Sequence, residues 1–168
     1  MKIPVSMVVI LLICLNASSL LADSKKQKAP KNLSSRFTLI KGEAFDKATK
    51  LTWRRCSAGC DWKEGVGCIG SPELMSLDEA IKFARQAGDG WRVPTIMELS
   101  SIIEQGGETP AINSIVFPDI MDLGDGAPFW SVTPFEEMPM LIYFVDFLSG
   151  RADGHSRGFK LAVRLVRN

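Results

Sequence analysis

Three cysteines and one histidine are the residues of this sequence whose types are most often used for chemistry. Cys56, Cys60 and Cys68 have the spacing Cys-x3-Cys-x7-Cys, and His155 is the single histidine of the chain. No histidine lies near the cysteines in sequence, so their spacing is not typical of a zinc site, and a redox Cys-x-x-Cys motif is absent. A catalytic histidine needs a nucleophile and an orienting acid, and the polar, Gly-rich segment Arg151–Gly158 supplies neither. We therefore expect His155 to lie in an exposed loop of a protein that is not an enzyme.

The cysteines are expected to form one structural disulfide bond. An odd number of cysteines follows the apolar leader described below, so at least one thiol is free or paired between chains. One bridge would clip an irregular, Gly-containing loop at Ser57–Gly67. Closing a loop of about a dozen residues stabilises a domain by about 3 kcal/mol in the chain-entropy model. Spacing alone leaves the pairing open: Cys56–Cys68 and Cys60–Cys68 both fit, whereas Cys56–Cys60 would close the tightest ring and need a sharp turn.

Aspartates recur between Asp119 and Asp125, with Asp122 between them. Calcium prefers several carboxylate oxygens close together, so the sequence does not decide whether this stretch binds calcium. Glu108-Thr109-Pro110 is also only loosely similar to an oxygen-ligand cluster, and we expect neither a metal nor a cofactor.

The first 22 residues have the layout of a secretory signal peptide. Met1-Lys2 is positively charged, an apolar stretch covers Val5–Leu15, and small residues lead to Ala22. This stretch is short for a transmembrane helix, although an uncleaved membrane anchor is the alternative. Cleavage is expected after Ala22, or alternatively at Ser19, and residues 23–35 are expected to form a flexible basic tether. The sequence therefore predicts export to the periplasm or the cell exterior, with no membrane span after cleavage.

Charge is distributed unevenly along the chain. The 168 residues carry 20 Lys and Arg against 19 Asp and Glu, a length that fits one domain, placed here at 36–168. That domain has 15 Lys and Arg against 18 Asp and Glu, a net charge of −3. The surplus positive charge lies in the leader and the tether, so composition gives no reason to expect nucleic acid as a partner.

Two helices are predicted in the middle of the domain. Residues 76–79, Ser-Leu-Asp-Glu, form a capping box, and apolar residues at helical spacing follow it as far as Gly88. Residues 95–98, Thr-Ile-Met-Glu, form a second box, and the helix that begins there is predicted to end at the Gly-Gly pair 106–107.

Strands are predicted on both sides of the helices. Their residue types place them at 36–40, 51–53, 129–133, 141–147 and 160–167, with turns at 149–150 and 153–154. Central helices between groups of strands predict an α+β domain and not an alternating parallel sheet.

An ordered set of short motifs runs from about Arg36 to Asn168. They are Leu51-Thr52-Trp53-Arg54-Arg55-Cys56, Cys68-Ile69-Gly70, Gly90-Trp91-Arg92-Val93-Pro94-Thr95 with Glu98-Leu99, Phe129-Trp130-Ser131, Val145-Asp146-Phe147 with Gly150, and Val163-Arg164-Leu165-Val166-Arg167. In this order the motifs resemble the Lcl C-terminal domain family. The resemblance implies a C-type-lectin-like fold, with two central helices packed on short, mostly antiparallel strands joined by long loops.

The resemblance also implies roles for the cysteines. The cysteine pair of the family corresponds to Cys56 and Cys68, which implies that these two form the disulfide bond. Cys60 is an addition to the family pattern and is expected to be unpaired. The same fold group holds the formylglycine-generating enzymes, whose cysteine pair Cys56 and Cys60 could imitate, but the disulfide accounts for Cys56 more simply.

Most residues of the motifs are expected to support the fold. Thr95 and Glu98 cap a helix, Pro94 restrains the residue before it, and tryptophans supply buried surface. Arginines of the motifs are expected to pair with Glu98 or Asp146. The full structural set is Trp53, Trp91, Arg92, Pro94, Thr95, Glu98, Trp130, Asp146, Arg164 and Arg167.

The resemblance implies a function at the cell surface. The family is named for the domain that closes a bacterial collagen-like surface adhesin, and that domain binds sulfated polysaccharide as part of a trimer. This chain has no collagen-like stalk, and its domain is acidic. We expect a secreted or surface-associated, non-catalytic binding module whose partner, a glycan or a surface protein, is contacted by loops between Gly106 and Pro139. The alternative is a structural subunit of a surface assembly, with Cys60 in a bridge between chains; a formylglycine-generating-like enzyme ranks last, and the oligomeric state stays open.

Overall fold

Nine strands and two helices form in the described part of the chain, which is residues 36–106 and 108–168 of this computed structural model. In chain order the elements are β1 (Phe37–Ile40), β2 (Glu43–Asp46), β3 (Thr52–Arg54), β4 (Cys60–Lys63), β5 (Gly67–Gly70), α1 (Leu77–Ala87), α2 (Ile96–Ser101), β6 (Pro128–Pro134), β7 (Leu141–Asp146), β8 (Arg151–Ser156) and β9 (Val166–Arg167). The signal peptide and the tether predicted at 1–22 and 23–35 lie outside the described residues. Neither described helix has the length and hydrophobicity that a membrane span requires.

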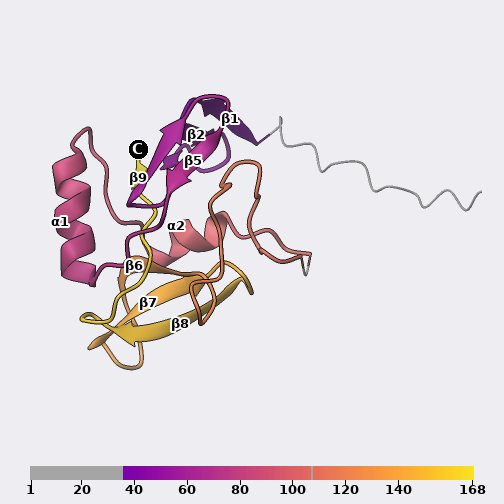
Figure 1. Ribbon diagram of the computed structural model, residues 1–168. Helices are drawn as coiled ribbons and strands as arrows, with labels where there is room; N and C mark the ends of the chain where they lie inside the picture. The colour runs from indigo at the N-terminus through magenta and orange to yellow at the C-terminus, as the bar shows by residue number, and fades with distance from the viewer. Residues whose placement is uncertain (1–35, 107) are drawn as a thin grey trace, which may run out of the picture. The chain divides into compact units, whose positions relative to one another are not determined.

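The strands form three antiparallel sheets. Their orders are β1-β2-β3-β9, β4-β5 and β6-β7-β8. Figure 1 shows the β6-β7-β8 sheet at the bottom of the view, β1 and β2 at the top, and α1 along one side. The short helix α2 packs against β6 and β7. Antiparallel sheets with two helices between them in sequence confirm the α+β prediction.

The first predicted helix is confirmed in detail. α1 begins after Ser76, whose hydroxyl accepts a hydrogen bond from the Glu79 backbone N–H, while the Glu79 carboxylate accepts one from the Ser76 backbone. It ends at Gly88, which adopts a positive φ of 66°. Leu77, Ala80 and Ala84 form its buried face.

The second predicted helix begins as expected but is shorter. The capping box at Thr95 forms, but α2 ends at Ser101, so the predicted end at 106–107 is wrong. Two interactions stop the helix: Arg36 donates a hydrogen bond of 2.7 Å to the Ser101 carbonyl, and Ile103 forms a β-bridge with Ile112. Tertiary contacts therefore end α2 before its glycine stop signal.

Three strand predictions need correction. The segment 57–67, predicted as an irregular loop, includes β4 and the turn into β5. β8 occupies 151–156, where a turn at 153–154 was predicted. The strand predicted at 160–167 is reduced to β9, because the residues before it form single bridges: Leu161 with Met75 and Ala162 with Phe129.

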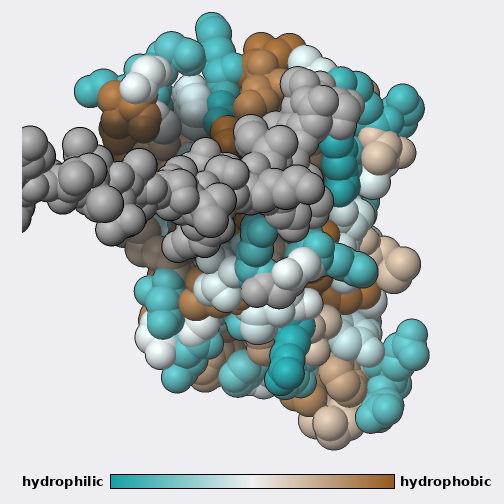
Figure 2. Space-filling model, turned by 90° about the vertical axis from the view of Figure 1, so that its right-hand side faces the viewer, coloured by the Kyte–Doolittle hydropathy of each residue, from teal (hydrophilic) through white to brown (hydrophobic). Residues whose placement is uncertain are grey.

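The segment 161–166 joins two hydrophobic cores. Ala162 and Val166 belong to one core, which also contains Trp53. Leu161, Val163 and Leu165 belong to the other, which also contains Trp91 and Trp130. Because extended backbone points successive side chains in opposite directions, one segment supplies both cores. Outside the cores, the face shown in Figure 2 carries hydrophobic residues in separate patches among hydrophilic ones.

Candidate functional site

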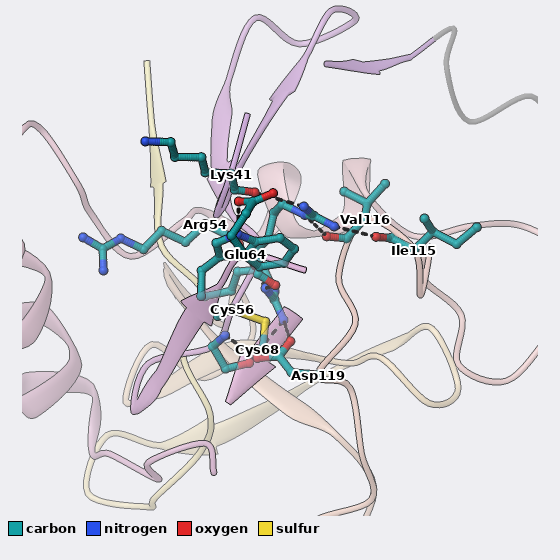
Figure 3. The surroundings of a disulfide bond; sticks show 12 residues. Lys41, Arg54, Cys56, Glu64, Cys68, Ile115, Val116 and Asp119 are labelled. Atoms are coloured by element: carbon teal, nitrogen blue, oxygen red, sulfur yellow. Dashed lines mark hydrogen bonds and ion pairs between the residues drawn. A yellow bond between two sulfur atoms is a disulfide. The ribbon is translucent and has the colours of Figure 1, made fainter. Parts of the chain in front are cut away.

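A disulfide bond anchors the β4–β5 hairpin to the end of β3. Cys56 and Cys68 are joined, with their Cα atoms 5.5 Å apart (Figure 3), as the family resemblance implied. Trp62 on β4 lies directly opposite Cys68 on β5, so the indole and the disulfide share one face of the hairpin. The hairpin therefore presents Trp62 from a covalently fixed position.

Arg55 fixes the surroundings of that hairpin. Its guanidinium donates hydrogen bonds of 2.9–3.0 Å to the carbonyls of Lys41, Ile115 and Val116, which Figure 3 shows around the disulfide. The same guanidinium stacks on the Trp62 ring, with its central carbon 3.9 Å from the ring centroid. The planar guanidinium thus links the segment of Arg55 with Lys41 and with residues 115–116, and it also packs against the indole.

A buried ion pair lies beneath the site. Arg164 Nη2 donates to Asp119 Oδ1 at 2.6 Å, and the other Arg164 nitrogen, Nη1, donates to the backbone carbonyls of Arg54 and Arg55. Asp119 Oδ2 accepts the backbone N–H of Ser57. Burial would raise the pKa of Asp119, but the Arg164 charge and the Ser57 hydrogen bond outweigh it and hold the pKa below its ordinary value.

This arrangement occupies carboxylate oxygens of the Asp119–Asp125 loop with hydrogen bonds from the protein. The Asp119 carboxylate is occupied by Arg164 and Ser57, and Asp122 Oδ1 accepts backbone N–H groups of Gly124 and Gly126. Within 36–106 and 108–168, no three His, Cys, Asp or Glu side chains gather as metal ligands. The loop is held by protein hydrogen bonds to its own carboxylates.

A hollow of about 420 Å³ opens beside the disulfide. Its lining comes from the end of β1, the β1–β2 turn, β2, β3 with the segment after it, and β4. The residues are Ile40, Lys41, Gly42, Glu43, Arg54, Cys56, Cys60, Asp61 and Trp62. A second, smaller hollow of about 210 Å³ shares Arg54, Cys56, Cys60 and Asp61 with it. We call the larger one the disulfide hollow.

Three charged side chains that line the disulfide hollow have no ion-pair partner among the described residues, and the guanidinium of one of them, Arg54, lies over the Trp91 ring. Glu43 is occupied, because it accepts a hydrogen bond of 2.8 Å from Arg167. Among the described residues, Lys41, Arg54 and Asp61 take part in no ion pair. Figure 3 shows the Lys41 and Arg54 side chains extending to the same side. The hollow thus offers two cations, one carboxylate and the Trp62 indole.

The unpaired thiol of Cys60 also lines the disulfide hollow. Cys60 is half-buried and belongs to no disulfide. Burial raises the pKa of this thiol, and the Asp119 carboxylate raises it further. A raised pKa lowers the fraction of reactive thiolate at neutral pH.

The second capping box carries an ion pair. Arg92 binds Glu98 through two hydrogen bonds of 2.7 Å, and Glu98 also accepts the Thr95 backbone N–H. The hydrogen bond from Arg92 lowers the pKa of Glu98 most, and burial opposes this effect. Pro94, just before the box, is buried.

The remaining motif arginines pair differently from the prediction. Arg164 binds Asp119 and Arg167 binds Glu43, so the predicted pairing of either with Asp146 or Glu98 is wrong. Asp146 instead accepts backbone N–H groups, including that of Ala127 at 2.8 Å, and closes a turn. A carboxylate that is already saturated by backbone donors does not need an arginine.

The tryptophans of the motifs are buried. Trp53 and Trp130 have no exposed surface, and Trp130 Nε1 donates to the Met75 carbonyl at 2.8 Å. Trp91 is 6% exposed, and the guanidinium carbons of Arg54 and Arg167 lie 5.0 and 4.6 Å from its ring centroid. These indoles support the fold, whereas Trp62 lines a hollow.

The prediction that His155 lies in an exposed loop is wrong. It is on β8, half-buried, and its ring stacks on Phe159 with centroids 3.6 Å apart. The structure therefore places the single histidine on a different sheet from the strands that line the disulfide hollow.

Sequence reasoning missed the residues that line this hollow. Arg54 was noted only as part of a family motif, and Lys41 was not assigned to any site. Asp61 and Trp62 were not singled out, since they were placed in an irregular loop. The alternation of half-buried and exposed residues in β4 was the available signal, but three cysteines so close together favoured a loop.

Comparison with known proteins yields a family match. A family model described as Lcl C-terminal domain matches residues 42–167. No curated protein and no solved structure matches the chain.

Proposed function

This chain belongs to the Lcl C-terminal domain family, and from that premise we propose that it is a surface-associated, non-catalytic binding module. Family membership supports a surface or adhesin-like role. The disulfide bond supports export, since such bonds persist in oxidising compartments outside the cytosol. A C-type-lectin-like fold is part of this proposal and rests on the family alone.

We propose that the ligand is a glycan and that it binds in the disulfide hollow. The observation that carries this proposal is the combination of the half-buried Trp62 indole with the charges of Lys41, Arg54 and Asp61 around one hollow. Its volume of about 420 Å³ lies within the range of small-molecule sites. Hydroxyl groups of a sugar ring need both donors and acceptors, and its C–H face packs on an aromatic ring.

The geometry gives less support to catalysis. Cys56 is engaged in the disulfide, so it does not form a thiol pair with Cys60. Asp61 is exposed and His155 lies on another sheet. A nucleophile, a base and an orienting group that converge within hydrogen-bond reach would be the signature of an enzyme site.

A glycan array with the exported protein tests the proposal. Binding that is lost in Trp62→Ala and weakened in Lys41→Gln supports it. Lys50→Gln is a matched control, because Lys50 is exposed and shares the positive φ of Lys41. If Trp62→Ala binds glycan as tightly as the unaltered protein, the glycan binds elsewhere. If the protein binds no glycan on the array, the proposed ligand becomes a surface protein.

A second candidate function is that of a structural subunit in a surface assembly. The observation in its favour is the unpaired, half-buried Cys60, which could form a disulfide bond with another chain. Gel electrophoresis without reductant tests it: a covalent dimer that disappears in Cys60→Ser supports the subunit role. Monomer alone would contradict it.

A further inference from the structure

Strands β7 and β8 of the three-stranded sheet share an uncharged face that is only partly buried. Pairing of β7 with β8 places six residues on this face: Leu141, Tyr143, Val145, Ala152, Gly154 and Ser156. Val145 shares a core with Leu99 of α2, whereas Ala152, which lies opposite Val145, is exposed. Toward the other end, Leu141 and Tyr143 are half-buried and Ser156 is exposed. This end of the sheet face is therefore partly open to solvent.

Phe135 lies across the uncovered end and fixes an aromatic pair there. Its ring centroid is 4.5 Å from that of Tyr143. It also rests against Gly154, where an added Cβ would lie 2.6 Å from the Phe135 ring. Glycine at 154 therefore allows Phe135 to approach the strand, and both rings are held in place while remaining half-exposed.

The loop that follows Phe135 also carries exposed apolar and acidic side chains. Met138 is 49% exposed and Met140 is 79% exposed, the highest value among the large hydrophobic residues in the described part of the chain. Glu136 and Glu137 are exposed, and neither has an ion-pair partner among the described residues. Methionine is flexible and common at binding surfaces, and aromatic residues are enriched at the centres of protein interfaces. We define the Phe135–Tyr143 surface as these two rings, the two methionines and the two glutamates.

We propose that the Phe135–Tyr143 surface binds a segment of a partner protein that presents apolar side chains flanked by Lys or Arg. The apolar side chains would cover the rings and methionines, and the basic residues would pair with Glu136 and Glu137. The two carboxylates repel an acidic glycan or an anionic lipid surface, so the charge favours a basic partner. The tether at residues 23–35 has lysines, but its apolar residues are only Ala29, Pro30 and Leu33, of which Leu33 alone has a large side chain.

Fluorescence anisotropy with two labelled peptides tests this proposal on the exported protein. One peptide alternates Leu and Lys, and the other, of equal length, alternates Leu and Glu. The Lys peptide should bind at least about tenfold more tightly than the Glu peptide, and added salt should weaken its binding. Met138→Ser with Met140→Ser should weaken binding about tenfold, and Glu136→Gln with Glu137→Gln about threefold or more.

Two variants serve as controls. Met121 is 46% exposed and lies in a different loop, so Met121→Ser should leave peptide binding unchanged. Trp62→Ala should also leave it unchanged, because this surface is separate from the disulfide hollow; the proposal thus stands or falls independently of glycan binding.

Three results would overturn the proposal. Equal binding of both peptides, or an equal loss in Met121→Ser, would show adsorption without a site. A dimer in light scattering that Met140→Ser dissociates would identify a second copy of the chain as the occupant. Competition of the Lys peptide by a neutral glycan would assign the aromatic pair to carbohydrate.

Discussion

Arg164 and Asp119 are 45 residues apart in sequence, yet their side chains meet at 2.6 Å with exposed fractions of 0% and 5%. The pair holds the loop of Asp119 against the strand that precedes the disulfide. Removing one partner leaves the other charge buried, which usually costs about 3–5 kcal/mol of folding free energy.

Asp119→Asn should therefore lower the free energy of unfolding by about 3–5 kcal/mol, because Arg164 then lacks its counter-ion. Urea denaturation measures the loss. Asp125→Asn is the control, since Asp125 is exposed and should change stability by no more than about 0.5 kcal/mol. Equal stability of the two variants would show that the pair contributes little.

Acid should unfold this domain through its buried and hydrogen-bonded carboxylates. Burial opposes ionisation of Asp46 and Asp146, but hydrogen bonds outweigh it and lower both pKa values. The largest hydrogen-bond contribution comes from the Arg36 side chain for Asp46 and from the Ser149 hydroxyl for Asp146, and backbone N–H groups add to both. Asp119 and Glu98 shift in the same direction. A carboxyl group whose pKa is lower in the folded state stabilises fully above its unfolded pKa, so stability should be lost as the pH falls below about 4. Melting temperatures between pH 7 and pH 2 test this, and a flat profile would contradict it.

Glu98→Ala should lower stability moderately without altering the disulfide hollow. The Glu98 side chain is 19% exposed and its partner Arg92 is 39% exposed, so water already weakens their attraction. Loss of the cap costs about 1 kcal/mol and the ion pair adds at most about 1 kcal/mol. Glu98→Gln should retain much of the cap and lose less. Unchanged melting together with lost ligand binding would make Glu98 a binding residue.

The cysteines should behave differently from one another in peptide mapping. Cys56→Ser or Cys68→Ser should cost about 3 kcal/mol, because the bridge closes a loop of 12 residues. Cys60→Ser should leave both the bridge and the melting temperature nearly unchanged. Alkylation of Cys60 should be slow at pH 7 and accelerate as the pH rises, in accord with its raised thiol pKa. A dominant intrachain bridge that contains Cys60 would contradict the structure.

The exported protein should begin near Asp23. The order of charged, apolar and small residues in the first 22 positions is that of a cleaved leader. N-terminal sequencing of secreted protein measures the start directly. Intact Met1 on membrane-embedded protein would exclude cleavage.

Local signals in the sequence predicted the parts of the fold that depend on neighbouring residues. Ser76 and Glu79 lie within one helical turn, so their capping box is visible in sequence and α1 follows from it. β8 was missed because Asp153-Gly154 is typical of a turn, whereas here Gly154 makes room for Phe135. The need for glycine at position 154 comes from the Phe135 ring, which lies 19 residues earlier in the chain. A local sequence pattern does not reveal this contact.

The site was less predictable than the fold for the same reason. Nothing near Arg164 identifies Asp119 as its partner, and nothing near Arg55 indicates the carbonyl oxygens that it binds. The disulfide pairing came from the family resemblance, since spacing left alternatives open. Long-range polar contacts of this kind are specified by the folded backbone.

The segment 161–166 also sets a time order for folding. Alternate residues of this segment complete two cores, so neither core closes until the chain has been synthesised and delivered as far as Val166. Contacts between residues so distant in sequence form slowly, because long loops must close first. For the export proposed above, this order would mean that the residues completing the fold are the last to cross the membrane.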